Sequence, residues 1–341
     1  MSKPTLLLTG AAGVLGRAFV EELAADYHLI GLRHRAAIDD PRVEELTGTL
    51  ADPHLGLGPE TSRELARRVD VVLHSAARTA WRGSREKLFA ANVTGTEHML
   101  AFAGTAAAPF YYVSTAFVAR PPDEEHRGAG PGAYVDSKIA AERVVRESGL
   151  PAAIVRPSVV GGDSRTGRIA SFQGMHKVLG GIVQGTIPVV PADPGSPFDT
   201  VPQDVVARGV KRLIAGGVTS GEYWLTAGRN SPTLGEYVEL ILQVAERMGH
   251  APQHPPRLMP AEVLDRLLLP LMEDAIPASL RQQFSGFIEL LLLFQSSSAM
   301  ESSFDALGMS DYVSHRALMA GFEKSVQYWI ATKMPARGVV T

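Results

Sequence analysis

Short apolar runs alternate with longer amphipathic segments through the first half of the chain. The apolar runs predict strands, and the longer segments repeat apolar positions every three or four residues, which is typical of helices. Predicted strands cover residues 6–9, 28–33, 69–74, 110–114 and 153–156, and predicted helices cover residues 14–25, 84–103 and 134–148. Because these strands are apolar on both faces, they fit a parallel sheet with helices on either side.

The pattern changes after residue 160. Residues 161–200 are rich in Gly and Pro, which predicts loops and one helix. A helix over 205–215, a strand over 222–226 and an amphipathic helix over 233–249 follow, and the remainder to about residue 332 is mainly helical. We predict an α/β protein with a Rossmann-type, doubly wound parallel sheet and a smaller, mainly helical C-terminal substrate cap. The dinucleotide-binding domain would comprise residues 1–160 with 200–230, and the cap residues 161–199 with 231–341.

Composition narrows the class of protein. A chain of 341 residues with a net charge of −3 gives no reason to expect nucleic acid or an anionic membrane as partner. The absence of cysteine excludes disulfides, a cysteine nucleophile and thiolate metal sites. The most apolar late run, 287–294, is far shorter than the ~20 residues that span a bilayer, and the N-terminal run is too short for a signal peptide. We expect a soluble, cytoplasmic protein without a membrane span or a metal site.

The first predicted strand leads into glycines at three-residue spacing. Gly10, Gly13 and Gly16 allow a sharp turn, close approach of the backbone to a pyrophosphate, and packing of the next helix on the sheet. The pyrophosphate would lie at the helix N-terminus. A tight turn without a ligand is the alternative. The cofactor contacts predicted here are Gly10, Ala12, Gly13, Val14, Leu15 and Gly16.

Two arginines follow the second predicted strand. An NAD enzyme usually has an acidic residue here for the ribose 2′-hydroxyl, whereas arginine suits the 2′-phosphate of NADP. Arg33 and Arg35, with no acid beside them, favour NADP(H) as cofactor, and Asp39 and Asp40 follow too late in the loop. The alternative is a solvated pair of surface arginines.

Tyr134 and Lys138 lie four residues apart in a predicted helix, so both side chains are on one face. A neighbouring ammonium favours the phenolate, and we expect it to lower the Tyr134 pKa from about 10. Such a phenol is a general acid suited to carbonyl reduction.

These motifs resemble the extended short-chain dehydrogenase/reductases in their order over residues 5–160. The resemblance implies that Thr115, in Val-Ser-Thr-Ala, and Asn92, in Asn-Val-Thr-Gly, join Tyr134 and Lys138 as catalytic residues. Asn92 corresponds to a structural asparagine that often belongs to a proton relay. The family resemblance also implies further cofactor contacts, namely Leu50, Ala76, Ala77, Lys138, Pro157, Ser158 and Val159.

Residues 49–57, 114–117, 160–167 and 198–205 resemble the thioester reductase and fatty acyl-CoA reductase branch, which includes male-sterility-like proteins. This resemblance implies reduction by NADPH of an acyl thioester, carried by an acyl carrier protein or CoA, to the aldehyde. A second hydride transfer would give the alcohol. The implied substrate contacts are Ala116, Phe117, Asp163, Ser164 and Thr166. For residues 163–167, a glycine-rich turn in which Asp163 caps its own backbone is an equal alternative.

Other functions stay open at this point. The chain could reduce or oxidise a free small carbonyl or alcohol, in the manner of dihydroflavonol and hydroxysteroid enzymes. A sugar-nucleotide epimerase is a third reading, against which Arg33 argues. A non-catalytic dinucleotide sensor would not need Thr115, Tyr134 and Lys138 together, so the presence of all three argues against this function. A homodimer is expected by analogy with related enzymes.

Overall fold

The computed structural model describes residues 3–79, 84–121, 130–172, 174–260, 263 and 298–334. The chain forms two compact units. The first, which we call the sheet unit, comprises Met1–Ser158, Gln203–Thr226 and Ser302–Met309. The second, which we call the helical unit, comprises Val159–Pro202, Ala227–Glu301 and Ser310–Thr341. The assignment of dinucleotide binding to the sheet unit and of substrate binding to the helical unit stays a prediction.

The sheet unit contains one seven-stranded sheet in which every neighbouring pair is parallel. Its strands are β1 (Thr5–Thr9), β2 (His28–Arg33), β3 (Val43–Thr47), β4 (Val71–His74), β5 (Phe110–Val113), β6 (Ala152–Pro157) and β10 (Glu222–Leu225). They lie in the order β10-β6-β5-β4-β1-β2-β3, so the winding direction reverses between β1 and β4. The predicted Rossmann-type fold is confirmed. A ligand crevice is expected outside the carboxyl ends of β1 and β4.

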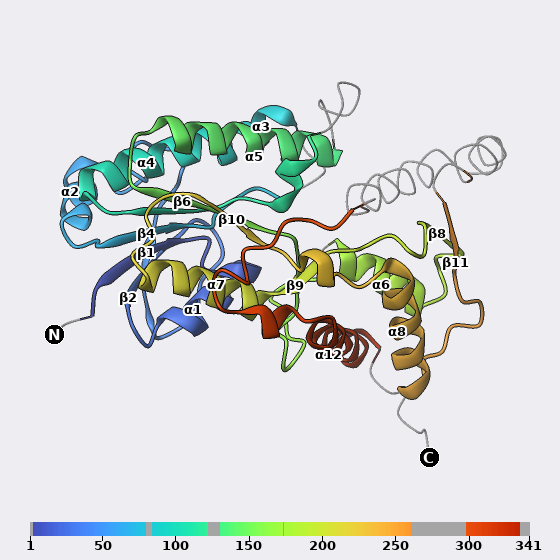
Figure 1. Ribbon diagram of the computed structural model, residues 1–341. Coiled ribbons are helices and arrows are strands. Elements are labelled where there is room, and N and C mark those ends of the chain that lie inside the picture. The colour runs from blue at the N-terminus through green and yellow to red at the C-terminus, as the bar shows by residue number, and fades with distance from the viewer. Residues whose placement is uncertain are drawn as a thin grey trace, which may run out of the picture. The chain divides into compact units, whose positions relative to one another are not determined.

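Helices cover both faces of this sheet (Figure 1). One face carries α1 (Val14–Leu23) and α7 (Gln203–Ala215), which contact each other. The other face carries α2 (Pro59–Ala66), α3 (Arg85–Phe89), α4 (Gly95–Ala106) and α5 (Gly130–Glu147). The predicted helix over 84–103 is interrupted, because a π-helical turn, η1 (Ala90–Thr94), joins α3 to α4. A π-helical turn inside a longer helix is frequently found at a functional site.

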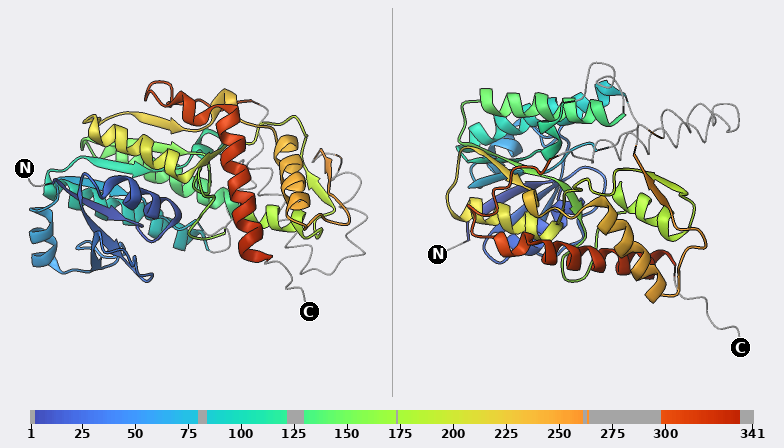
Figure 2. Two further views of the ribbon diagram at one scale, coloured as in Figure 1. Left: turned by 90° about the horizontal axis from the view of Figure 1, so that it is seen from below. Right: turned by 45° about the vertical axis from the view of Figure 1, so that its right-hand side comes forward.

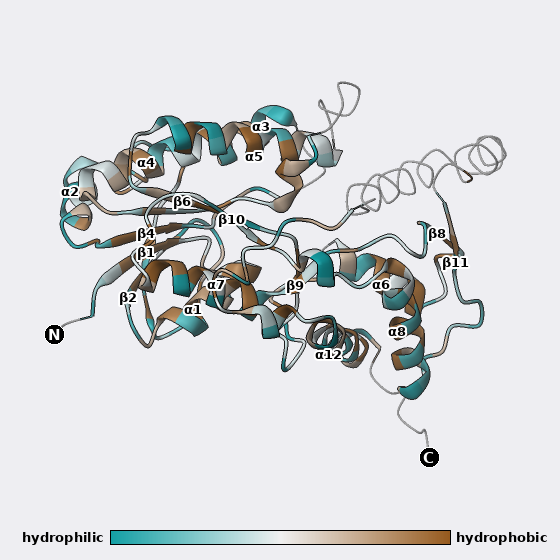
Figure 3. Cartoon of the chain, viewed as in Figure 1, coloured by the Kyte–Doolittle hydropathy of each residue, from teal (hydrophilic) through white to brown (hydrophobic). Residues whose placement is uncertain are grey.

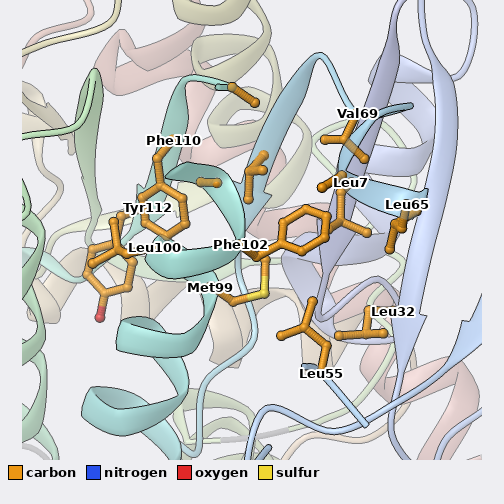
Figure 4. Close-up of a cluster of buried hydrophobic side chains, with 14 of the residues drawn as sticks. Leu7, Leu32, Leu55, Leu65, Val69, Met99, Leu100, Phe102, Phe110 and Tyr112 are labelled. Atoms are coloured by element: carbon orange, nitrogen blue, oxygen red, sulfur yellow. The ribbon is translucent and has the colours of Figure 1, made fainter. Parts of the chain in front are cut away.

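The core of the sheet unit lies between the strands and the layer that contains α4. Leu7 of β1, Phe102 of α4 and Phe110 of β5 are almost completely buried there (Figure 4). Hydropathy colouring shows apolar residues along the strands and polar ones on outward helix faces (Figure 3). Since fully burying such a side chain contributes about 2 kcal/mol, this cluster stabilises the packing of α4 on the central strands.

The edge strand β3 of the sheet unit was not predicted. β3 lies at the sheet edge, and polar side chains occupy most of its sequence, Val-Glu-Glu-Leu-Thr. An edge strand needs to bury little surface, so the apolar pattern that marks the central strands is missing.

A buried ion network joins α5 to β6 and β10. The Arg156 guanidinium contacts the Glu142 carboxylate at 2.6 Å and the Glu222 carboxylate at 2.5 Å, and it lies over the Trp224 ring. Arg146 contacts both carboxylates as well. Arg156 and Glu142 are almost completely buried, so the charge of each must be compensated within this network.

We expect Glu142→Gln to lower the free energy of unfolding by about 2 kcal/mol, because charge-assisted hydrogen bonds to Arg156 are weakened inside the protein while Glu222 remains. Urea denaturation measures the change. The matched control is Glu147→Gln on the same helix, whose exposed pair with Arg143 has a 3.9 Å separation and should contribute less than about 1 kcal/mol. Equal effects of the two substitutions would contradict the assignment.

The helical unit packs α6 (Met175–Val183), α8 (Leu234–Arg247) and α12 (His315–Lys333) against one another. The helix α12 is the long red helix in Figure 2. The helical unit also contains two short parallel strand pairs, β7 (Val159–Gly161) with β9 (Thr200–Pro202) and β8 (Val189–Pro191) with β11 (Arg257–Met259). Thr233 and Glu236 form a capping box, and α8 begins at Leu234, one residue after the predicted start at 233.

Some of the remaining predictions for the C-terminal half concern residues that the structure describes, and one concerns residues that it does not. The predicted helix over 205–215 corresponds to α7, and the strand over 222–226 corresponds to β10. The apolar run 287–294 lies outside the described residues. Among the residues that the structure describes, none of the helices combines the length and the apolar character needed to cross a membrane.

Candidate active site

The glycine turn after β1 has two glycines that the backbone itself requires. Gly10 has a φ of +76°, and a Cβ there would lie 2.8 Å from the Ala76 nitrogen. A Cβ at Gly16 would lie 2.0 Å from the Gly10 oxygen. The loops after β1 and β4 therefore meet backbone to backbone, and α1 packs directly on the turn. These contacts explain Gly10 and Gly16 without reference to a ligand.

Gly13 differs from both, because its backbone does not require glycine. It is extended, with φ −78° and ψ 179°, and a Cβ would meet the Gly10 oxygen at 3.1 Å and no other atom within 4 Å. Gly13 is also the N-cap residue of α1, which has no side-chain cap and no acidic residue in its first turn. The amide groups at this helix start are therefore suited to an anion, as the sequence predicts for a pyrophosphate.

Two buried serine hydroxyls lie at the carboxyl ends of neighbouring strands. Ser114 follows β5 and is 4% exposed, and Ser158 follows β6 and is 5% exposed. Neither hydroxyl has a hydrogen-bond partner among the residues that the structure describes. Buried hydroxyls normally have partners, so a polar ligand group fits this edge of the sheet. Together with the glycine turn, these hydroxyls fit a bound dinucleotide.

The arginine at the end of β2 has an acidic partner that the sequence pattern did not reveal. Arg33 Nε lies 2.7 Å from Glu45 Oε1, and Glu45 Oε2 accepts a hydrogen bond of 2.6 Å from the Ile38 amide. The expectation that no acid accompanies the arginines is wrong, because the acid comes from the neighbouring strand β3. Arg35 is exposed, and its Nε contacts His34 Nδ1 at 3.4 Å.

Leu50, a predicted cofactor contact, lies in the turn that follows β3. Its side chain packs at the start of α4, where a Cβ on Gly95 would be 3.2 Å from the Leu50 Cβ. The Leu50 carbonyl lies 2.8 Å from His98 Nδ1. The turn is therefore fastened to α4, and the cofactor contact itself stays a prediction.

The Tyr134 hydroxyl on α5 is hydrogen-bonded to the Thr115 hydroxyl at the end of β5. Burial raises the pKa of Tyr134 to about 12, and the bond to Thr115 opposes that rise. Thr115 is almost completely buried, and its Oγ1 accepts a hydrogen bond of 3.4 Å from the Phe117 amide. Ala116 and Phe117, two predicted substrate contacts, are buried in the short helix η2 (Ala116–Ala119). The structure thus joins two of the predicted catalytic groups.

Lys138 directs its ammonium to β5. Its Nζ donates hydrogen bonds to the Tyr112 hydroxyl at 2.9 Å and the Val113 carbonyl at 2.7 Å. Burial lowers the pKa of Lys138 to about 7, and Glu142 opposes the fall. The predicted lowering of the Tyr134 pKa by Lys138 is wrong for the protein as described, because burial of the phenol dominates and raises that pKa.

Asn92 lies in the π-helical turn η1, and its side-chain amide is fully used. Its Oδ1 accepts from the Arg78 amide at 2.7 Å, and its Nδ2 donates to the Arg78 carbonyl at 3.1 Å and the Ser137 hydroxyl at 2.8 Å. Ser137 in turn donates to the Tyr134 carbonyl at 2.7 Å. Asn92 therefore fastens the loop after β4 to the helical turn that carries Tyr134. A part in a proton relay stays a prediction.

The loop that contains Asp163 belongs to the helical unit. Asp163 Oδ1 accepts from the Thr166 amide at 2.9 Å, the Thr166 hydroxyl at 2.8 Å and the Arg165 amide at 3.1 Å. The carboxylate thus caps its own turn, as one of the two alternatives for this loop proposed. Substrate contacts of Asp163, Ser164 and Thr166 stay predictions. Val159 also belongs to the helical unit, whereas Pro157 and Ser158 belong to the sheet unit.

Several polar groups at the site escaped the sequence analysis, namely His74, Thr96, Tyr112, Ser114 and Glu45. A signal existed for two of them, because His74 and Tyr112 are polar or amphipathic residues in strands that are otherwise apolar. Within the described parts of the chain, no group of three or more His, Cys, Asp or Glu side chains is placed to hold a metal ion.

Known proteins resemble this chain in sequence. The family model described as male sterility protein matches residues 31–210, just over half of the chain. The polyketide synthase-nonribosomal peptide synthetase ACE1 of Pyricularia oryzae is 31% identical over 188 residues, 46% of this chain and 5% of that protein. A linear gramicidin synthase protein of Brevibacillus parabrevis is 29% identical over 246 residues, 61% of this chain and 5% of that protein. The chain thus spans about a twentieth of the length of these curated relatives.

Solved structures extend the resemblance to nearly the whole chain. The terminal R domain from the myxalamid PKS-NRPS biosynthetic pathway is 25% identical, with a TM-score of 0.75 over 98% of this chain and 92% of that one. The reductase domain of a non-ribosomal peptide synthetase from Mycobacterium tuberculosis has the same fold, with 24% identity and a TM-score of 0.66 over 97% and 92%. By the family match, the chain belongs to the male sterility protein family.

Proposed function

We propose that this protein is an NADPH-dependent reductase that converts an acyl thioester, carried by an acyl carrier protein or by CoA, to the aldehyde. The observation that carries the proposal is the pairing of the Tyr134 hydroxyl with the buried Thr115 hydroxyl, on the same sheet edge as the glycine turn. The relatives support a thioester substrate, since they are parts of polyketide and peptide synthetases. A carrier protein as partner is supported by a structure of the same fold that joins a thiolation domain to a reductase domain.

The side chains present can protonate and stabilise the oxygen of a reacting carbonyl. The raised pKa of Tyr134 keeps the phenol protonated at neutral pH, as a proton donor requires. Its hydroxyl and that of Thr115 would both donate hydrogen bonds to the carbonyl oxygen as negative charge grows there. The surroundings are buried, so these interactions are stronger than they would be in water.

The other groups would orient the reactants. A dinucleotide, when bound, supplies the hydride. Its pyrophosphate would be held by the start of α1 beside Gly13, and its ribose hydroxyls by Lys138. Once the carbonyl carbon is reduced, expulsion of the thiol leaves the aldehyde, and a second reduction would give the alcohol. A homodimer and a cytoplasmic location stay predictions.

The test compares NADPH consumption and thiol release with acyl-CoA thioesters, acyl-pantetheine thioesters, and free ketones and aldehydes. We expect one thiol released for each thioester reduced. Turnover of free ketones without any thiol release would replace the proposal by a reductase of small carbonyl compounds.

The preference for NADPH depends on Arg33. We expect Arg33→Ala to weaken NADPH binding by about tenfold or more and NADH binding much less, because only NADPH carries the 2′-phosphate that a guanidinium binds. Calorimetric titration with both dinucleotides measures the two changes. Arg42→Ala serves as control, because it also removes one paired arginine, whose partners are Asp40 and Glu21, but this arginine is not assigned to the dinucleotide. Equal weakening of both dinucleotides by Arg33→Ala would contradict the 2′-phosphate contact.

A further inference from the structure

Three polar side chains form one row across the centre of the sheet. Thr9 of β1, His74 of β4 and Tyr112 of β5 are paired in register, so they project to the same face of the sheet. Their exposed fractions are 1%, 0% and 1%. Two residues earlier, the same strands contribute Leu7, Val72 and Phe110 to the apolar cluster. Polar groups so deeply buried need hydrogen-bond partners, and all three have them.

The direction of each hydrogen bond follows from the donors available. The Ala76 amide donates to Thr9 Oγ1 at 3.1 Å. Because Thr96 donates its proton to the Asn92 carbonyl, His74 Nε2 must be the donor to Thr96, and Thr9 donates to His74 Nδ1 at 2.7 Å. His74 Nδ1 is then an acceptor. Burial lowers the pKa of His74 to about 3, which keeps the ring neutral with its proton on Nε2. His74 therefore donates to Thr96 Oγ1, at 3.2 Å.

Thr96 interacts with His74 and with the hydroxyl of Tyr112. The Thr96 hydroxyl donates to the Asn92 carbonyl at 2.7 Å, so its oxygen is left to accept from His74 Nε2. The Tyr112 oxygen accepts a hydrogen bond from Lys138 Nζ, 2.9 Å away. Figure 4 shows this oxygen directed away from the apolar cluster.

Lys138 is nearly enclosed, being 2% exposed, and its charge depends on the few groups around it. Glu142 lies one turn further along α5 and Tyr134 one turn before it, while β5 supplies Tyr112 and β4 supplies the neutral His74. Within the described residues, the ammonium donates to the Tyr112 hydroxyl and the Val113 carbonyl. The Tyr112 hydroxyl is therefore the one side-chain acceptor that the structure gives Lys138.

We propose that Tyr112 is a positioning residue whose hydroxyl holds the Lys138 ammonium at the carboxyl end of β5, with the His74 ring stacked on the Tyr112 ring. The expected effect on catalysis rests on the proposed function. The contact between Tyr112 and Lys138 involves residues of the sheet unit alone. A neighbouring chain of hydrogen bonds begins at the Ala76 amide, beside the glycine turn, and runs through Thr9 and His74 to Thr96.

The test compares Tyr112→Phe with Tyr111→Phe. Tyr111 is the adjacent buried tyrosine of β5, and its side chain projects to the opposite face of the sheet. Both changes remove one hydroxyl and keep the ring. The first readout is the pKa of Lys138 in the dinucleotide-free protein, followed by the NMR shift of its Cε. We expect Tyr112→Phe to lower this pKa by about one unit, because the ammonium loses an acceptor. Tyr111→Phe should leave it unchanged.

The second readout is turnover of the thioester with NADPH. We expect Tyr112→Phe to reduce kcat by about tenfold with little change in KM for the thioester, because the ammonium is less well held. The loss of kcat at alkaline pH should move to lower pH by the same amount as the Lys138 pKa. Thr96→Val should act in the same direction, and Thr96→Ser, which keeps the hydroxyl, should restore wild-type behaviour.

The outcomes separate this inference from the proposed function. An unchanged Lys138 pKa in Tyr112→Phe and in Thr96→Val would overturn the positioning role, whatever the activity. Failure of the wild-type protein to release thiol would overturn the proposed function, while the NMR comparison would still decide the role of Tyr112. Should Tyr112→Phe not fold, Thr96→Val provides the same test through the second hydroxyl.

Discussion

Tyr134→Phe is expected to reduce kcat for thioester reduction at least ~10²-fold while leaving dinucleotide affinity nearly unchanged. The substitution removes the proposed proton donor and one of two hydrogen bonds to the carbonyl oxygen, and positioned general acids typically contribute 10² or more. The ring stays in place, so packing on Thr115 and the fold should be retained. Stopped-flow measurement of NADPH oxidation gives kcat, and calorimetry gives the affinity.

Tyr223→Phe is the matched control for Tyr134→Phe. Its hydroxyl donates to the Ser220 carbonyl at 3.0 Å, outside the groups assigned to the site. Wild-type kcat is expected for this control. If Tyr134→Phe also retained wild-type kcat, Tyr134 would not be the proton donor, and Thr115 would have to be reconsidered in that role.

Gly13→Asp is expected to weaken dinucleotide binding by at least ~10²-fold without loss of stability. A carboxylate at the start of α1 would repel the pyrophosphate by about 4 kcal/mol at a separation of ~4 Å near a protein surface. The extended backbone of Gly13 is open to residues other than glycine, and aspartate is a favourable N-cap, so the fold should be kept once the Gly10 oxygen, 3.1 Å from the new Cβ, shifts by a few tenths of an ångström. Calorimetric titration with NADPH measures affinity, and urea denaturation measures stability.

Two further glycine variants make this test specific. Gly13→Ala adds no charge and should weaken binding less than Gly13→Asp. Gly16→Ala would place a Cβ 2.0 Å from the Gly10 oxygen, and it should lower the free energy of unfolding by about 1–3 kcal/mol or more. Wild-type NADPH affinity in Gly13→Asp would show that the pyrophosphate does not lie at the start of α1.

The local pattern of the sequence was sufficient to predict the central strands and the helices that follow them. β2 has the predicted bounds, and α1 begins at the predicted residue, because the apolar period and the glycine turn are properties of adjacent residues. The same reasoning could not predict β3, whose membership of the sheet depends on pairing with β2 rather than on its own composition. It missed Glu45 for the same reason.

The sequence by itself determined which chemical groups this protein has near the ends of its strands, including Tyr134, Lys138, Thr115 and the glycine turn. Only the tertiary structure decided how those groups are paired. It joins Tyr134 to Thr115 and Lys138 to Tyr112, and burial moves the pKa of Tyr134 upward where helical spacing predicted a fall. The physical reason is that hydrogen bonding and desolvation depend on which strands and helices meet, and parallel pairing brings together residues far apart in the chain.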